Sequence, residues 1–200
     1  MFFDNLPKTV IIGGTEYEIN SDFRTSIKFE KLLFDSEISK EEALLKGIEL
    51  YYPKRPHDEK EALERIIWFY MCGEDPKPNG NKEKRLYSIE YDFKYIYSAF
   101  LEQYSLDLFE VDMHWWKFQA LFTSLNDCMF QKIVGYRAVD VKKLPVDERK
   151  RYRKLQEIFA LPNNDSKNRP DEIKFQKGLE ESLLNGDVSE FLKENKYETD

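Results

Sequence analysis

Histidine, cysteine, glycine and proline are all scarce in this chain of 200 residues. The two histidines and two cysteines are not spaced as paired metal ligands on a helix or in a knuckle, so neither a metal nor any other cofactor is expected. Eight glycines and eight prolines fall below average usage, which is about 12% for the two together. With 34% charged residues, this composition favours helices over a turn-rich β-sandwich.

Long apolar runs are also missing. The longest covers residues 66–72, far short of the roughly 18–20 residues that cross a bilayer. The first residues have neither the basic stretch nor the apolar region of a secretory signal. Cys72 and Cys128 are therefore expected to be free thiols in a reducing compartment. These absences predict a cytoplasmic protein without membrane contact.

No motif assembles a catalytic site. Gly13-Gly14 lacks the further glycines and the lysine of a phosphate loop. His57 lies in a proline-flanked loop and is expected to be exposed. His114 is expected in the first turn of a helix, where the helix dipole disfavours its protonated form, and a structural role is favoured over a catalytic one. We therefore expect a protein that is not an enzyme.

Hydrophobic periodicity predicts a mainly α-helical fold. Strands at 10–12 and 16–19 flank paired glycines, which supply the positive φ of a tight hairpin turn. Apolar stripes and capping residues predict helices over about 23–34, 40–52, 59–71, 88–104 and 146–161. A further helix, capped by Asp112, is predicted to continue to Met129 or Ile133, with a break at Gly135-Tyr136-Arg137.

Composition divides the chain near residue 161. Residues 1–161 are predicted to form the helical domain with its N-terminal hairpin. Residues 162–200 begin with a polar linker and continue into an acidic segment with a weak apolar pattern, expected to be a loosely packed helix. From 161 to 200 there are 6 basic and 10 acidic residues. Such a segment can stay without fixed structure until it binds a partner.

Two aromatic pairs are candidates for partner binding: Trp115 with Trp116, and Trp68 with Phe69. Neighbouring residues on a helix point about 100° apart, so one member of a pair can enter the core while the other faces a second surface. Trp is enriched at the energetic centres of interfaces as well as in cores. Spacing alone does not choose which member of each pair is the contact.

One basic patch stands out in a chain whose net charge is −7. Residues 140–154 hold seven basic and three acidic side chains, and Arg149, Arg151 and Arg153 are the candidate polar contacts. The patch fits a solvated helix face, a surface for an acidic protein partner, or a nucleic-acid helix. The overall acidic charge argues against general binding of nucleic acid or anionic membranes.

Several short motifs follow one another in a distinctive order. They are Leu6-Pro7, 13–17, 19–24, 69–73, 95–100, His114-Trp115-Trp116-Lys117-Phe118 and Tyr136-Arg137. This order resembles a family of small bacteriophage proteins, which siphophages and prophages of Gram-positive bacteria encode between the major tail protein and the tape-measure protein. The resemblance spans roughly residues 6 to 155, and its most specific string is the one that carries the tryptophans.

The resemblance implies a tail assembly chaperone. Such a protein coats the apolar tape-measure protein in the host cytoplasm until tail protein polymerises, and is expected to be absent from the finished virion. Helix-in-groove binding and self-association into an open spiral would suit a long helical rod. Two alternatives from other classes are a structural virion component, such as a tail completion or connector subunit, and a nucleic-acid-binding regulatory factor that uses residues 142–154.

Overall fold

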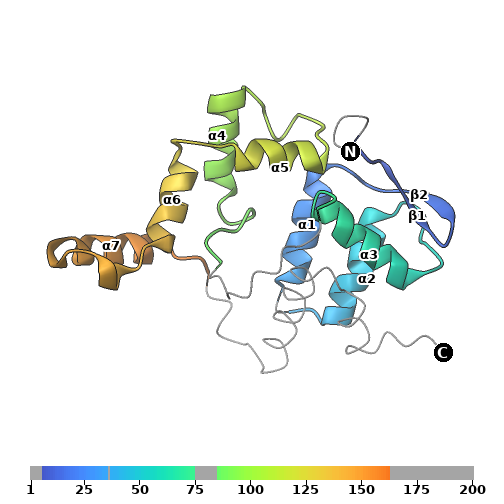
Figure 1. Cartoon of the computed structure of the whole chain (residues 1–200), viewed down its shortest axis with the longest axis horizontal. Helices are drawn as coiled ribbons and strands as arrows, with labels where there is room; N and C mark the ends of the chain where they lie inside the picture. The colour runs from blue at the N-terminus through green and yellow to red at the C-terminus, as the bar shows by residue number, and fades with distance from the viewer. Residues whose placement is uncertain (1–5, 36, 75–84, 163–200) are drawn as a thin grey trace. The chain divides into compact units, whose positions relative to one another are not determined.

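The computed structural model describes residues 6–35, 37–74 and 85–162, and these form two compact units (Figure 1). The first unit holds the described residues up to 74 together with 113–119. The second holds 85–112 and 120–162. The predicted mainly helical fold with an N-terminal hairpin is confirmed. Beyond Pro162, the predicted C-terminal segment lies outside the described residues, and its boundary stays a prediction.

The first unit begins with the predicted antiparallel hairpin of β1 (Thr9–Ile12) and β2 (Thr15–Glu18). Gly13 and Gly14 form its turn at φ +56° and +76°, as the paired glycines predict. The strand alternates strictly, since Val10 and Ile12 are buried while Ile11 is exposed. The hairpin is tied to the third helix by a 2.7 Å hydrogen bond from the Gly13 backbone N–H to the Glu61 carboxylate.

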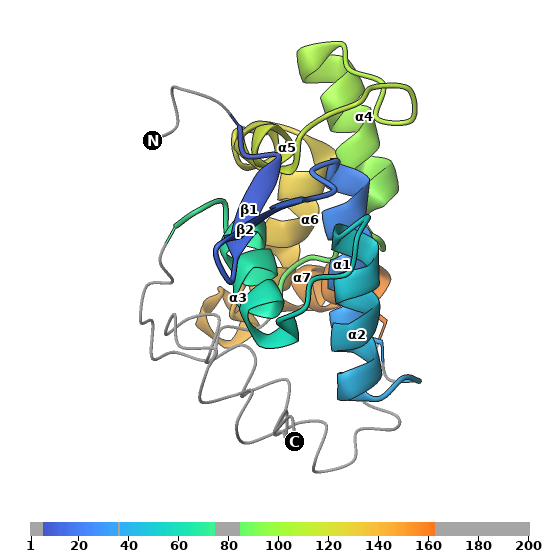
Figure 2. The ribbon, with the colours of Figure 1, turned by 90° about the vertical axis from the view of Figure 1, so that its right-hand side faces the viewer.

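Three helices follow in the first unit: α1 (Phe23–Leu33), α2 (Lys40–Tyr51) and α3 (Glu59–Tyr70). Each begins at a predicted cap, because the side chains of Asp22, Ser39 and Asp58 accept backbone N–H groups of the first turn. Helix α1 packs on α2 and α2 on α3, and both views show α1 and α2 side by side (Figure 2).

Aromatic side chains dominate the core of the first unit. Tyr51 is fully buried, and its ring lies edge-on to Phe29 at 5.3 Å and to Phe69 at 6.0 Å. Its hydroxyl donates a 2.8 Å hydrogen bond to the buried Ser26 hydroxyl, so the polar end of the ring is satisfied. Burial raises the Tyr51 pKa, and the phenol therefore stays neutral.

The second unit contains α4 (Phe93–Tyr104), the end of α5 (Trp115–Thr123), α6 (Met129–Ala138), the short 3₁₀ helix η1 (Val141–Lys143) and α7 (Val146–Ile158). Helix α4 begins five residues later than the periodicity predicts. Residues 88–92 form a turn instead, in which the Asp92 carboxylate accepts the Ser88 backbone N–H at 3.1 Å. The Asp92 carboxylate is fully buried and pairs with the Arg137 guanidinium.

The prediction of one helix running from the tryptophans to Met129 is wrong. Helix α5 ends at Thr123, and α6 starts at Met129. Between them Asp127 has φ +43°, and the Gln103 side chain exchanges hydrogen bonds with the Asn126 backbone. Ser, Asn and Asp compete with the backbone for hydrogen bonds and therefore end helices. The predicted break at Gly135-Tyr136-Arg137 is also wrong, because these residues lie inside α6.

Two helix-interior glycines are expected to respond to alanine with opposite signs. A methyl group on Gly135 would meet no atom within 4 Å, so Gly135→Ala should stabilise the protein by about 0.5–1 kcal/mol through helix propensity. At Gly47 the added carbon would lie 2.6 Å from Cε2 of the buried Phe29, so Gly47→Ala should be destabilising. Urea unfolding of the two variants checks this. Two shifts of the same sign would contradict it.

Candidate partner-binding surfaces

Residues 113–118, which contain the adjacent tryptophans, are bound into the first unit along their backbone. The Phe23 backbone N–H donates to the Met113 carbonyl at 2.9 Å, and the Trp115 N–H donates to the Ser21 carbonyl at 2.8 Å. These two bonds form an isolated antiparallel bridge beside the start of α1. The backbone of this segment is thus fixed beside the start of α1.

Both indoles cap the C-terminal end of α3. The last carbonyls of a helix have no partner inside the helix. Trp115 Nε1 donates to the Tyr70 carbonyl and Trp116 Nε1 to the Phe69 carbonyl, each at 2.8 Å. Two adjacent tryptophans therefore satisfy two successive carbonyls of another helix, a structural role that their sequence spacing did not reveal.

The backbone after α3 forms a Schellman motif. The Gly73 N–H donates to the Trp68 carbonyl and the Cys72 N–H to the Phe69 carbonyl, with Cys72 at φ +57° and Gly73 at φ +74°. A side chain on Gly73 would approach Cη2 of Trp116 to 2.9 Å. Glycine is thus required at 73 by its backbone conformation and by the adjacent indole.

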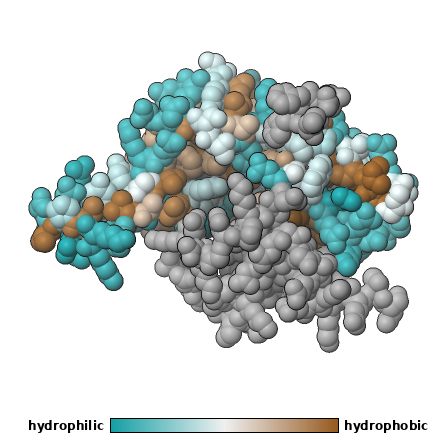
Figure 3. All heavy atoms as spheres, in the orientation of Figure 1, coloured by the Kyte–Doolittle hydropathy of each residue, from teal (hydrophilic) through white to brown (hydrophobic). Residues whose placement is uncertain are grey.

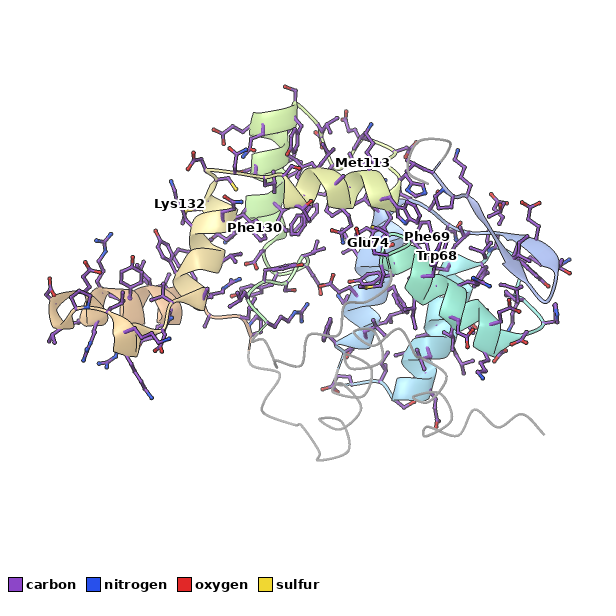
Figure 4. All side chains as sticks on the ribbon, in the orientation of Figure 1. Trp68, Phe69, Glu74, Met113, Phe130 and Lys132 are labelled. Atoms are coloured by element: carbon purple, nitrogen blue, oxygen red, sulfur yellow. The ribbon has the colours of Figure 1, made fainter. Side chains whose placement is uncertain are left out.

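The four aromatic candidates differ in what they expose. Phe69 and Trp115 are fully buried and Trp116 is 8% exposed, whereas Trp68 is 36% exposed. The Trp68 ring lies edge-on to Trp116 at a centroid distance of 5.5 Å. Figure 4 labels Trp68 and Phe69 on α3. Partner binding by these residues stays a prediction. Of the four side chains, Trp68 is the exposed one, and the other three are buried.

His114, and not the predicted Asp112, caps α5. Its Nδ1 accepts the Trp116 backbone N–H at 3.1 Å, while Nε2 lies 2.8 Å from the Pro7 carbonyl, which fits a neutral ring protonated on Nε2. Burial and, less strongly, the positive charge of Lys8 lower its pKa from 6.5, against the raising effect of the Pro7 carbonyl. The direction agrees with the sequence prediction, but burial is the main cause. His57 is exposed, as predicted.

Acid should destabilise the protein through His114. Because the folded-state pKa lies below that of the unfolded chain, this contribution is complete above about pH 6.5 and decreases as pH falls toward the lowered value. The slope is at most about 1.4 kcal/mol per pH unit for one group. Urea midpoints between pH 5 and 7.5 should therefore fall with acid in the wild type and less in His114→Asn, whose amide also caps a helix but does not titrate. Parallel profiles would contradict the assignment.

The second candidate surface is the outer face of α7. No residue of this helix is buried, and Val146 and Ile158 are 77% and 59% exposed. Lys150, Arg151, Arg153 and Lys154 are all exposed, and within the described residues none of the four forms an ion pair. In Figure 3 apolar atoms follow α7 between hydrophilic ones. Within the second unit, α7 packs on α6 and η1.

The three predicted arginine contacts do not share one environment. Arg149 is half-buried and bonds the Leu144 carbonyl at 2.9 Å and the Lys142 carbonyl at 3.2 Å, so it holds the turn before the helix. Arg151 and Arg153 lie on the exposed face. The geometry therefore leaves Arg151 and Arg153 available for a partner and gives Arg149 a structural role.

One exposed aromatic cluster, centred on Phe109, was not among the predicted contacts. Phe109 is 69% exposed and lies edge-on to Phe93 at 5.6 Å and to Tyr97 at 5.0 Å. Asp107 holds the cluster, because its carboxylate accepts the Phe109 N–H at 2.9 Å and the Tyr97 hydroxyl at 3.3 Å. The signal available in the sequence was Asp107, because an aspartate side chain often accepts the backbone N–H two residues on in an Asx-turn.

The described residues contain no group of three or more metal-binding side chains. Among the same residues, none of the helices is long and apolar enough to cross a bilayer. Both thiols are free, and burial, followed by the charge of Glu74, raises the pKa of Cys72 from 9.0 to about 12. Such a thiol is unreactive at neutral pH.

The fold defines a mainly α-helical protein with an N-terminal β-hairpin, and the comparison with known families then identifies its family. Residues 2–161 match the model of the family described as Bacteriophage Gp15 protein. The chain belongs to this family of phage proteins. No curated protein and no solved structure matches the chain.

Proposed function

We propose that this protein is a non-enzymatic tail assembly chaperone that binds the tape-measure protein in the cytoplasm of the bacterial host. Its membership of the Bacteriophage Gp15 protein family supports a role in the phage life cycle. The observation that carries the proposal further is α7, a helix with exposed apolar and cationic side chains and no buried residue. A helix exposed in this way suits binding to another chain.

Two kinds of contact are available for such a partner. Trp68 offers an exposed aromatic ring, which packs edge-on against the buried Trp116 ring. Arg151 and Arg153 offer cations that can steer an acidic segment toward α7. Self-association into an open spiral is part of the proposal, since a chaperone for a long rod has to act at many positions along it.

Co-expression with the tape-measure protein of the same phage tests the proposal. We expect the tape-measure protein to become soluble and to co-purify with this chain at high salt, because apolar contacts are not screened. Trp68→Ala should weaken retention by about 30-fold, the effect of a 2 kcal/mol hot spot. Tyr91→Ala, at an aromatic residue that is 50% exposed in the other unit, is the matched control and should leave retention unchanged.

Two results would overturn the proposal. A tape-measure protein that stays insoluble and unbound at every salt concentration would remove the chaperone role. Detection of this chain by mass spectrometry in purified virions, at a stoichiometry of one or a few rings, would favour a tail completion or connector subunit instead.

A further inference from the structure

The exposed face of α7 concentrates charge of one sign. Lys150 and Lys154 are four residues apart, and Arg151 lies three residues before Lys154, so these side chains are neighbours on the helix surface. Like-charged pairs at this spacing destabilise a helix. Asp147 and Glu157 are on the same helix, yet neither forms an ion pair with these cations within the described residues. An acidic occupant would relieve this repulsion.

The chain itself carries a segment of the opposite charge. Residues 179–200 contain seven acidic and two basic side chains. The acidic ones are Glu180, Glu181, Asp187, Glu190, Glu194, Glu198 and Asp200. Leucines at 179, 183 and 184 and the pair Phe191-Leu192 give the same segment apolar side chains to set against the exposed Val146 and Ile158.

Chain length allows the acidic segment to reach the whole helix. Helix α7 has 13 residues and is about 20 Å long. Residues 159–178 separate it from the acidic segment, and the last 16 of these alone span up to about 50 Å when extended. Tethering at this length supplies an effective concentration in the millimolar range, so contacts that are weak between separate molecules become populated.

We propose that residues 179–200 bind the outer face of α7 in the same molecule and cover its cations until a partner displaces them. This face, formed by Lys150, Arg151, Arg153 and Lys154, is then a binding site for acidic segments. The protein's own residues 179–200 occupy it. A partner with an acidic segment of its own has to compete for it. This contact does not require that the partner be the tape-measure protein.

Paramagnetic broadening in the full-length protein tests the contact. A nitroxide is attached to Ser189→Cys, which labels selectively because Cys128 is buried and Cys72 is half-buried with a raised pKa. We expect amide signals of residues 150–154 to lose most of their intensity at low salt. They should recover at about 1 M salt, where the Debye length is only about 3 Å.

A charge-matched pair of variants separates this contact from a general effect of charge. Neutralising the four cations of the face (Lys150→Gln, Arg151→Gln, Arg153→Gln and Lys154→Gln) should abolish the broadening. Neutralising four exposed lysines of the other unit (Lys28→Gln, Lys54→Gln, Lys60→Gln and Lys117→Gln) removes the same charge and should leave it intact. Far-UV circular dichroism of both variants checks that the total helix content is unchanged.

Three outcomes would overturn the proposal. The α7 amides could be unaffected by the label, or the face variant could broaden as the wild type does. Equal broadening in a mixture of isotope-labelled protein without the nitroxide and unlabelled protein with it would assign the site to a second copy. None of these outcomes depends on the tape-measure experiment, so the two proposals fail independently.

Discussion

Replacing Arg137 by alanine should destabilise the second unit by about 3–5 kcal/mol, the usual effect of breaking a buried ion pair. Arg137 is 5% exposed and Asp92 is fully buried. The guanidinium holds both carboxylate oxygens, at 2.7 and 2.8 Å, and also donates to the Leu86 carbonyl at 3.0 Å and the Phe159 carbonyl at 2.6 Å. Alanine would leave a buried carboxylate without its counter-ion and two carbonyls without this donor.

The loss of stability should come from breaking the Asp92–Arg137 ion pair and not from removing any arginine. Arg137→Lys should also be destabilising, because an ammonium does not reproduce the two-pronged geometry. In a double-mutant cycle, Asp92→Ala with Arg137→Ala should cost clearly less than the two single changes added together, since neither charge is then left unpaired. Arg149→Ala, which removes two carbonyl bonds from a half-buried site, is the control and should cost about 1 kcal/mol or less.

The tryptophans allow the two units to be followed separately. All three, Trp68, Trp115 and Trp116, belong to the first unit, so indole fluorescence reports on that unit while far-UV circular dichroism reports on both. In Arg137→Ala the dichroism midpoint in urea should fall, and a loss of helix should precede the fluorescence change. A variant as stable as Arg149→Ala by both probes would contradict the role of the pair.

The hairpin and the helix starts of the first unit were predictable because local chemistry determines them. Gly13-Gly14 dictates a tight turn, and Asp22, Ser39 and Asp58 each accept a hydrogen bond from their own helix. Such interactions connect residues no more than about four positions apart. The hairpin turn and the helix caps can therefore be predicted from a short stretch of sequence.

The sequence-based predictions are wrong or incomplete where the structure depends on contacts between residues that are far apart in the sequence. Helix α5 ends at Thr123 although apolar spacing continues, since Asn126 is held by Gln103 from another helix. The use of Asp92 and Arg137 as one buried pair joins residues 45 positions apart. The caps on α3 likewise come from indoles more than 40 residues away. Without the fold, each of these residues looks like an ordinary surface or core position.

Replacing Trp115 by alanine should destabilise the first unit by about 3–5 kcal/mol through lost packing alone. Its ring is fully buried and stacks on Tyr70 at 5.3 Å and on Phe118 at 5.7 Å. Loss of the indole N–H also removes a donor from the Tyr70 carbonyl, which adds to the cost. Trp68→Ala, at the 36% exposed indole, should cost much less, and thermal unfolding followed by circular dichroism compares them.

Phenylalanine substitutions separate the capping bonds from the packing. Trp116→Phe leaves the Phe69 carbonyl with the Cys72 backbone N–H at 3.0 Å, so that carbonyl stays satisfied. Trp115→Phe leaves the Tyr70 carbonyl facing the Cys72 thiol at 3.9 Å, a weak donor at a long distance. If the indoles act as caps, Trp115→Phe should be the more destabilising change, by about 1 kcal/mol or more. Equal losses would mean that the adjacent tryptophans contribute through ring volume, and the capping role would have to be abandoned.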